Sequence, residues 1–160
     1  MTSIRRVEDR DREAILSIAR TTDAFTAEDV VCVDELLTTY LRNGDSHEYT
    51  FLAATDDQGR VIGFVCYGPT PLTDRTFDAY WLAVSPASRR QGTGKALFLQ
   101  MEENLRNAGA RLLVLETSGT PEYAAARRMY ERLGWTGRLA APDFYRQGDD
   151  LIIYSKPLQS

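Results

Sequence analysis

The sequence contains little of several residue types that mark particular classes of protein. Its two cysteines, Cys32 and Cys66, are too few for a disulfide framework, and each stands in an apolar run that predicts a buried thiol. The one histidine, His47, lies in a polar stretch with no cysteine or second histidine at metal-ligand spacing. We therefore expect His47 in a surface loop, and the sequence favours neither a metal site nor a catalytic triad that needs histidine.

Long apolar runs and an excess of basic residues are also absent. No stretch approaches the ~18 uninterrupted apolar residues of a membrane-spanning helix, and residues 1–13 are charged where a signal peptide would be apolar. The 19 Lys+Arg residues are outnumbered by 23 Asp+Glu, which gives a net charge of -4, so no global field attracts a nucleic acid backbone. The sequence predicts a cytoplasmic protein without a membrane or nucleic acid partner.

What the chain does contain is typical of one compact domain spanning residues 1–160. Its composition is 43% apolar and 10% aromatic, enough for a sizeable core. Hydrophobic periodicity, with glycine and proline at the breaks, predicts the element order βααβββαβαββ. Because antiparallel hairpins are mixed with a strand-helix-strand crossover, we expect an α/β (α+β) fold with one mixed sheet covered by helices. The predicted elements are a strand at Ile4–Val7, helices around residues 9–19 and 26–41, strands at Tyr49–Thr55, Arg60–Tyr67 and Thr76–Val84, a helix with Leu97, Met101, Leu105 and Ala108 on one face, a strand at Leu112–Thr117, a helix at Pro121–Leu133, and strands at Trp135–Leu139 and Leu151–Lys156.

Two of these predictions concern local geometry. The stretch 56–59 between two strand patterns ends in Gly59, which predicts a hairpin with a type I turn and a left-handed glycine at its exit. The continuous apolar character of Thr76–Val84 predicts a central strand that is covered on both faces.

A glycine-rich basic turn follows that central strand and leads into a helix. It reads Arg89-Arg90-Gln91-Gly92-Thr93-Gly94-Lys95, so free backbone N–H groups and the positive end of the helix point to one spot. The two glycines let the backbone approach a ligand with no Cβ in between. The turn predicts an anion site, although a helix start with a solvated basic turn explains the same residues. It is not a Walker loop, because no Ser or Thr follows the lysine, and it lacks the glycine order of a dinucleotide fold.

Two motifs together resemble the GNAT acetyltransferase superfamily. The first is Arg89-x-x-Gly92-x-Gly94 after a strand that ends Leu82-Ala83-Val84-x-Pro86, which is similar to the acyl-CoA loop of that family. The second is Ala126-x-x-x-Tyr130-x-x-x-Gly134-Trp135, which resembles the family signature with tryptophan in the usual phenylalanine place. The resemblance implies a GNAT-like, mostly antiparallel sheet of about seven strands flanked by four helices.

The resemblance also implies the residues that hold acetyl-CoA, with no metal. The turn would bind the pyrophosphate, chiefly through backbone N–H groups, and the end of the preceding strand would pair with the amides of the pantetheine arm. Many family members carry a cofactor-binding asparagine seven places before the motif tyrosine, where this chain has Tyr123. The implied cofactor-binding residues are Leu82, Ala83, Val84, Arg89, Arg90, Gln91, Gly92, Thr93, Gly94, Lys95, Tyr123, Arg127 and Tyr130.

Two side chains are candidates for catalysis. Tyr130 resembles the family tyrosine that protonates the departing thiolate, but it also lies on an apolar helical stripe that must face the sheet, so a core role explains it as well. Glu116 interrupts an apolar strand, where a carboxylate must be solvated, paired or used. It resembles the glutamate that several family members use as general base, and a salt bridge to an arginine is the alternative. Asp78 and Tyr80 are second choices for the base.

The function that follows is N-acetylation of a primary amine by direct attack in a ternary complex. Acidic residues at the expected acceptor side suggest a cationic small molecule or peptide amine, although the same charges are common on any surface. A non-catalytic acyl-CoA-binding module, a larger acyl donor and a protein N-terminus as acceptor remain open alternatives, as does a homodimer. The candidate substrate-binding residues are Asp78, Tyr80, Phe144 and Tyr145, with Trp81 as a further apolar wall and Asp74, Asp143, Asp149 and Asp150 as further acidic residues.

Overall fold

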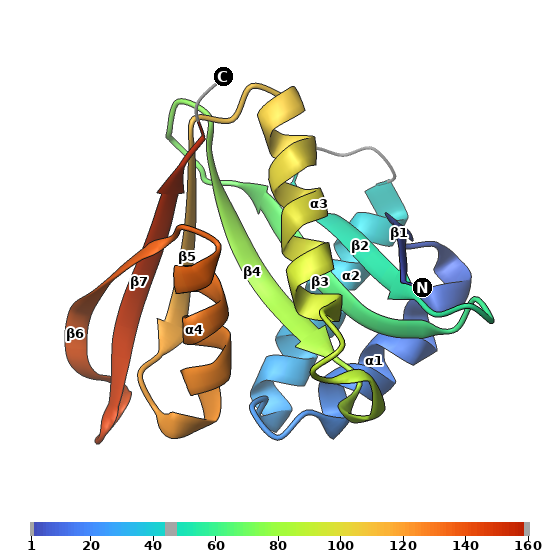
Figure 1. Ribbon diagram of the computed structural model, residues 1–160, viewed down its shortest axis with the longest axis horizontal. Coiled ribbons are helices and arrows are strands. Elements are labelled where there is room, and N and C mark those ends of the chain that lie inside the picture. Colours follow the sequence, from blue (N-terminus) through green and yellow to red (C-terminus); the bar gives the residue numbers. More distant parts are fainter. Residues whose placement is uncertain (1, 44–47, 159–160) are drawn as a thin grey trace.

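A computed structural model describes residues 2–43 and 48–158, and the predicted order of helices and strands is confirmed (Figure 1). Short 3-10 turns at Asp9–Asp11, Pro86–Ser88 and Pro121–Tyr123 precede three of the helices. His47 lies outside the described residues. The elements are β1 (Ser3–Arg6), α1 (Arg12–Thr21), α2 (Ala27–Asn43), β2 (Thr50–Thr55), β3 (Val61–Pro69), β4 (Thr76–Val84), α3 (Thr93–Asn107), β5 (Leu112–Ser118), α4 (Ala124–Arg132), β6 (Thr136–Arg146) and β7 (Asp149–Pro157).

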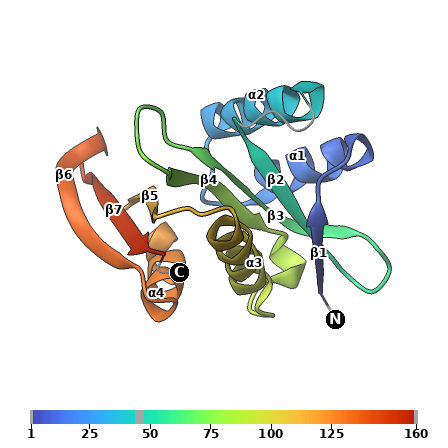
Figure 2. The ribbon, with the colours of Figure 1, turned by 90° about the horizontal axis from the view of Figure 1, so that it is seen from above.

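The strands form one seven-stranded sheet in the order β1-β2-β3-β4-β5-β7-β6. Its paired strands are antiparallel apart from β4 and β5, which are parallel and joined by α3. Helices α1 and α2 cover one face, and α3 and α4 cover the other (Figure 2). The mixed, mostly antiparallel sheet with helices on both faces is therefore confirmed.

The parallel pair at the centre of the sheet separates along its length. Strands β4 and β5 pair at Thr76–Leu112, Phe77–Leu113 and Asp78–Val114, and no described pairing continues beyond that point. From there the two strands diverge toward the loop that precedes α3 (Figure 1). The backbone groups along the rest of this edge of β4 are consequently left without a strand partner.

Each face of the sheet has its own hydrophobic core. Under α3 and α4 the core contains Leu97, Phe98, Met101 and Tyr130. Under α1 and α2 it contains Ile15, Val33, Leu37, Phe51 and Phe64, with Tyr80 and Trp81 at its edge. The sheet thus has two separately packed sides, one on each face.

Several local predictions need correction. Residues along β4 are mostly only partly buried, because one side of the strand borders a cavity where full cover was expected. Ala108 is exposed and follows the last residue of α3, since the helix ends at Asn107 before Gly109 in the left-handed conformation. Cys66 is buried as predicted, but Cys32 is only partly buried.

The C-terminal elements also differ in length from those predicted. Strand β6 continues past Leu139 to Arg146, through Pro142. A proline is tolerated there because β6 is an edge strand, where its missing N–H interrupts no ladder. The predicted helix at Pro121–Leu133 begins as a 3-10 turn, and only Ala124–Arg132 is α-helical. The hairpin glycine Gly59 has the predicted left-handed conformation, with φ of 77°.

Candidate active site

The basic turn before α3 leaves its backbone open to a ligand. Gly92 has φ of 79°, which favours glycine, and a Cβ placed there would meet no atom within 4 Å. The first N–H groups of α3 follow directly and have no partners within the helix. The side chains of Arg89, Arg90 and Lys95 are exposed around the same turn. The structure therefore brings positive charge, free N–H groups and open space together at the end of β4.

Thr93 takes part in this turn through its backbone, because its side chain is buried. Gly63 on the neighbouring strand makes room for it, since a Cβ at Gly63 would lie 3.2 Å from the Thr93 Cγ2 atom. Gly94 faces the opposite side, where a Cβ would make ordinary contact with Met129 of α4 and with Leu82 and Val84. The turn is thus held between β3 and α4 while its N–H groups remain free.

The last residues of β4 offer a free strand edge beside this turn. Leu82, Ala83 and Val84 pair with β3 on one side, but the β5 side of the strand is open beyond Asp78. In addition, the register with β3 shifts at Tyr80, which is a β-bulge. A bulge re-aims side chains and bends the strand, and here it lies where β4 and β5 separate.

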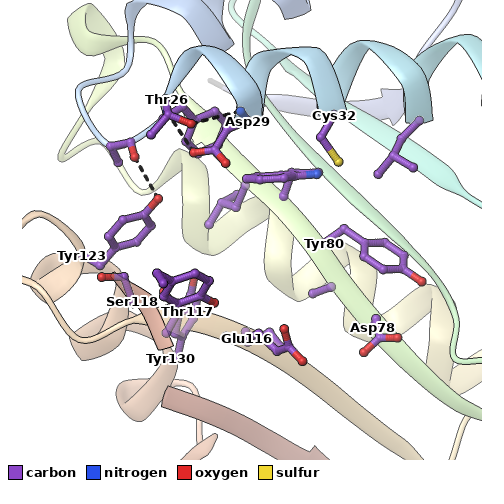
Figure 3. Close-up of a pocket in the computed structure, with 18 of the residues that line it drawn as sticks. Thr26, Asp29, Cys32, Asp78, Tyr80, Glu116, Thr117, Ser118, Tyr123 and Tyr130 are labelled. Atoms are coloured by element: carbon purple, nitrogen blue, oxygen red, sulfur yellow. Dashed lines mark hydrogen bonds between the residues drawn. The ribbon is translucent and has the colours of Figure 1, made fainter. Parts of the chain in front are cut away.

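A cavity of about 530 Å³ occupies the gap between the diverging strands (Figure 3). Its walls come from the segment between α1 and α2, from α2 itself, from β4 and β5, and from the β6–β7 hairpin. The cavity is lined by Ala24, Phe25, Thr26, Asp29, Cys32, Leu36, Tyr49, Asp78, Ala79, Tyr80, Trp81, Leu82, Phe98, Leu115, Glu116, Thr117, Ser118, Tyr123, Tyr130, Tyr145, Arg146 and Asp149.

Glu116 points into this cavity from β5. Its neighbour Leu115 is buried under α3 and α4, so the alternation of the strand places Glu116 on the α1 and α2 face. The residue is exposed, and no ion pair to it is seen among the described residues. Solvation therefore explains how the strand tolerates this carboxylate. The expected alternative, a salt bridge to an arginine, is absent from the part of the chain that the structure describes.

Tyr130 reaches the cavity from the opposite side of the sheet. It is 7% exposed and its ring stacks on Phe98 with centroids 5.2 Å apart, while Trp135 and Tyr154 complete the aromatic cluster. Burial raises the pKa of the Tyr130 hydroxyl, so this group keeps its proton at neutral pH. The ring is a core residue, and the same residue also lines the cavity, so its burial in the core leaves the predicted acid role possible.

The candidate substrate-binding residues divide into two groups. Asp78, Tyr80 and Tyr145 line the cavity, whereas Phe144 does not; it is 55% exposed and packs edge-to-face on Tyr145. Burial, and secondarily the charge of Asp78, raises the pKa of Tyr80 to about 12. Burial and the nearby Glu116 raise the pKa of Tyr145.

Of the further acidic residues, only Asp149 lines the cavity. It accepts hydrogen bonds from the Ser118 hydroxyl and from Arg146. Asp74 instead forms ion pairs with two arginines, Arg75 and Arg111. Asp143 and Asp150 accept backbone N–H groups within the β6–β7 hairpin. These three carboxylates therefore stabilise loops outside the cavity.

Tyr123 and Arg127 support the loop between β5 and α4. The Tyr123 hydroxyl donates to the carbonyl of Ala24, 2.9 Å away in the segment between α1 and α2, a hydrogen bond that spans the gap between the two halves of the sheet (Figure 3). Burial raises the pKa of Tyr123 to about 12. Arg127 donates to the carbonyls of Ser118 and Thr120 at 2.6 and 2.9 Å.

The comparison with known families agrees with this geometry. The model of the acetyltransferase (GNAT) family matches residues 14–135. The chain belongs to the GNAT acetyltransferase family. The resemblance carried by the loop and the tyrosine motif is thereby confirmed, and acyl transfer is the chemistry of this family. A GNAT-family protein from Desulfovibrio desulfuricans has a solved structure with a TM-score of 0.93, 39% identity, and coverage of 99% of this chain and 100% of that one.

Curated relatives match over a smaller share of their own length. The mycothiol acetyltransferase of Amycolatopsis mediterranei is 30% identical over 137 residues, covering 81% of this chain and 44% of that protein. The uncharacterised N-acetyltransferase YhbS of Escherichia coli is 30% identical over 114 residues, 63% of this chain and 65% of that protein. A structure of yncA from Salmonella typhimurium with acetyl-CoA shares the fold, with a TM-score of 0.80 at 23% identity, and covers 99% of this chain and 95% of that one.

The turn and the free edge of β4 fit acetyl-CoA. A pyrophosphate needs N–H donors and positive charge, which the turn offers with no Cβ at Gly92 in the way. The amides of a pantetheine arm need an unpaired strand edge, which β4 offers from Ala79 onward. The implied role of Leu82–Val84 and Arg89–Lys95 is therefore compatible with the structure.

Sequence reasoning missed the part of the cavity that comes from the N-terminal half. Phe25 lines it from the segment before α2, Asp29 and Cys32 from the first turns of α2, and Tyr49 from the position before β2. No local motif marks these residues, and only the packing of the N-terminal half on this face of the sheet brings them to the site. In the described ranges, no helix has the length and apolar character to span a membrane, and no group of three or more metal-ligating side chains is found.

Proposed function

We propose that the protein transfers the acetyl group of acetyl-CoA to a primary amine of a small molecule or peptide, within a ternary complex. The observation that carries this proposal is the cavity at the separation of β4 and β5. A carboxylate reaches it from one face of the sheet and a protonated tyrosine from the other. The acyl-CoA turn lies at the end of the same strand, β4.

The turn and the free edge of β4 would hold acetyl-CoA, which supplies the acetyl group as a thioester. Backbone N–H groups from Gly92 to Lys95 bind the pyrophosphate, and the side chains of Arg89 and Arg90 add charge. Leu82 and Val84 pair with the pantetheine arm on the edge that β5 leaves open. The arm is thereby directed along β4 toward Tyr130.

Glu116 and Tyr130 have complementary roles in the proton balance. Glu116 accepts a proton from the ammonium group of the acceptor, and the neutral amine then attacks the carbonyl carbon. A C–N bond forms, the C–S bond breaks, and the Tyr130 hydroxyl donates a proton to the departing sulfur. The attacking nitrogen loses its remaining extra proton to water, and a proton from water restores the Tyr130 hydroxyl. Because the pKa of Tyr130 is raised by burial, this residue enters the reaction as an acid. Binding both reactants side by side contributes further, since effective molarities reach ~10⁵ M or more.

A screen for acetyl-CoA-dependent thiol release over a library of amines tests the proposal. Turnover with any amine, abolished by leaving out either substrate, is the expected result. A protein that binds acetyl-CoA by titration calorimetry and turns over no amine is a binding module, and that result would overturn the proposal. Parallel assays with longer acyl-CoA donors define the acyl chain that the cavity accepts.

A further inference from the structure

The walls of the cavity are aromatic and arranged in rigid pairs. Phe25 of the segment before α2 packs edge-to-face on Trp81 of β4, with ring centroids 5.0 Å apart. Tyr49 packs in the same way on Tyr80, at 5.7 Å. Each pair joins a residue from the N-terminal half to a residue of β4, so the rings hold one another in place. Such preformed flat walls suit an apolar or aromatic body on the acceptor.

The charges in the cavity are unequally distributed. Two carboxylates, Asp78 and Glu116, lie where β4 and β5 part (Figure 3). Asp78 is opposite Val114 in the parallel register, and Glu116 stands two residues further along β5, so both carboxylates point to the same face of the sheet. The Thr70 hydroxyl, which is uncharged, donates to Asp78 at 2.7 Å.

The remaining charged residues of the lining do not reverse this balance. Arg146 is its one cation among the described residues, and it forms an ion pair with Asp149 at 3.3 Å while its side chain is 66% exposed. Asp29, a further carboxylate, accepts the backbone N–H of Thr26 at the start of α2. The interior of the cavity therefore presents negative charge next to the position of the reacting amine, and its cation is neutralised.

We infer that the acceptor is an amine that carries an apolar, ring-sized body and no carboxylate next to the amine. This inference rests on the proposed function and names the substrate class of the same site. An ammonium group is attracted by Asp78 and Glu116, whereas a carboxylate on the adjacent carbon is repelled by both. The aromatic pairs then enclose the body of the acceptor. Amines of the arylalkyl type meet both requirements, whereas a free aromatic α-amino acid has the ring but carries a carboxylate next to its amine.

Three matched acceptors test this inference in the same thiol-release assay. Phenethylamine and phenylalanine differ by one carboxylate, and phenylalaninamide has the size of phenylalanine without its charge. We expect kcat/KM for phenethylamine to exceed that for phenylalanine by at least about tenfold. The kcat/KM for phenylalaninamide should be close to that for phenethylamine. Ethylamine, which lacks the ring, is expected to fall about tenfold or more below phenethylamine because it buries less apolar surface.

The variant Asp78→Asn tests whether the preference for phenethylamine over phenylalanine arises in the cavity. It is expected to narrow the ratio between phenethylamine and phenylalanine severalfold, whereas Asp74→Asn, which changes a carboxylate outside the cavity, leaves the ratio unchanged. Two results would overturn the inference and leave the proposed function standing. One is equal kcat/KM for phenylalanine and phenethylamine, and the other is an Asp78→Asn variant in which the ratio of these two values is unchanged. No turnover of any amine by a protein that binds acetyl-CoA contradicts both.

Discussion

The two sides of the splayed sheet are built from the chain in different ways. The side under α3 and α4 takes the acyl-CoA turn and Tyr130 from two short segments, residues 82–95 and 126–135. The acceptor side collects Phe25, Cys32, Tyr49 and Glu116 from positions spread over most of the chain. The first side offers free backbone N–H groups and a packed ring, and the second presents side chains to a solvated cavity.

This difference teaches which part of a site is encoded locally. Backbone recognition needs a defined order of glycines and strand residues, so it leaves a contiguous motif in the sequence. A cavity wall needs only side chains of suitable size and charge, and any element that crosses the sheet can supply them. The proposed donor side therefore leaves a family motif in the sequence, while the proposed acceptor side leaves none.

The largest expected effect concerns Glu116 on the acceptor side. Glu116→Gln retains the shape of the side chain but cannot accept a proton, so kcat should fall by about 10² to 10⁴-fold while acetyl-CoA affinity is unchanged. The pH–rate profile of the variant should lose its acidic limb. Glu103→Gln, an exposed carboxylate on α3, is the matched control. A wild-type profile in Glu116→Gln would place the base elsewhere.

The next effect concerns Tyr130, on the side of the sheet under α3 and α4. Tyr130→Phe preserves the ring that stacks on Phe98 and removes the hydroxyl, so we expect kcat to fall about 10²-fold with little change in melting temperature. Tyr154→Phe removes a hydroxyl from the same aromatic cluster, one that donates to Glu131 outside the cavity, and should retain normal turnover. Full activity in Tyr130→Phe, measured where chemistry limits the rate, would leave this residue a role in packing alone.

A substitution in the turn should weaken the binding of acetyl-CoA and leave the binding of the amine unchanged. Gly92→Val places a β-branched side chain at a φ of 79° and into the open space of the turn, so we expect acetyl-CoA to bind at least about tenfold more weakly. Gly59→Val is a matched control, because Gly59 has a φ of 77° and equally open surroundings in the β2–β3 hairpin, outside the turn. Isothermal titration of both variants with acetyl-CoA measures the difference. Equal affinities of Gly92→Val and Gly59→Val for acetyl-CoA would show that the turn does not bind the donor.

The smallest expected effect is on stability at alkaline pH. Burial raises the pKa of both Tyr80 and Tyr123 to about 12, above the ordinary value near 10. Between these values the unfolded chain loses protons that the folded chain keeps, so the free energy of unfolding should decrease as pH rises from about 10 to 12. Urea unfolding at pH 9 and 11 measures the decrease. In Tyr123→Phe the free energy of unfolding should decrease less between these two pH values. An equally steep decrease in that variant would show that Tyr123 does not contribute to the pH dependence of stability.

The sequence predicted most of the fold because its signals are local. Glycines at 59, 109 and 134 mark turns and helix ends, and all three have a left-handed conformation in the structure. The full length of β6 could not be predicted, because Pro142 normally ends a strand and only the edge position makes it acceptable.

For the candidate site, the residues could be predicted where a motif or a chemical anomaly marks them. Glu116 was found because a carboxylate interrupts an apolar strand. Phe25 and Cys32 carry no such mark, since an aromatic residue and a thiol in or near an amphipathic helix are typical of ordinary core positions. Their place in the cavity depends on how α2 and the segment before it pack on one face of the sheet, which is a property of the tertiary structure.

The central claim is that donor and acceptor bind together from opposite faces and meet where β4 and β5 part. Initial rates measured with acetyl-CoA and an accepted amine varied against each other test it most directly. Direct attack in a ternary complex predicts double-reciprocal lines that intersect. Parallel lines would show that acetyl first transfers to a protein nucleophile, with the Cys32 thiol in the cavity as the group to examine, and would contradict the account.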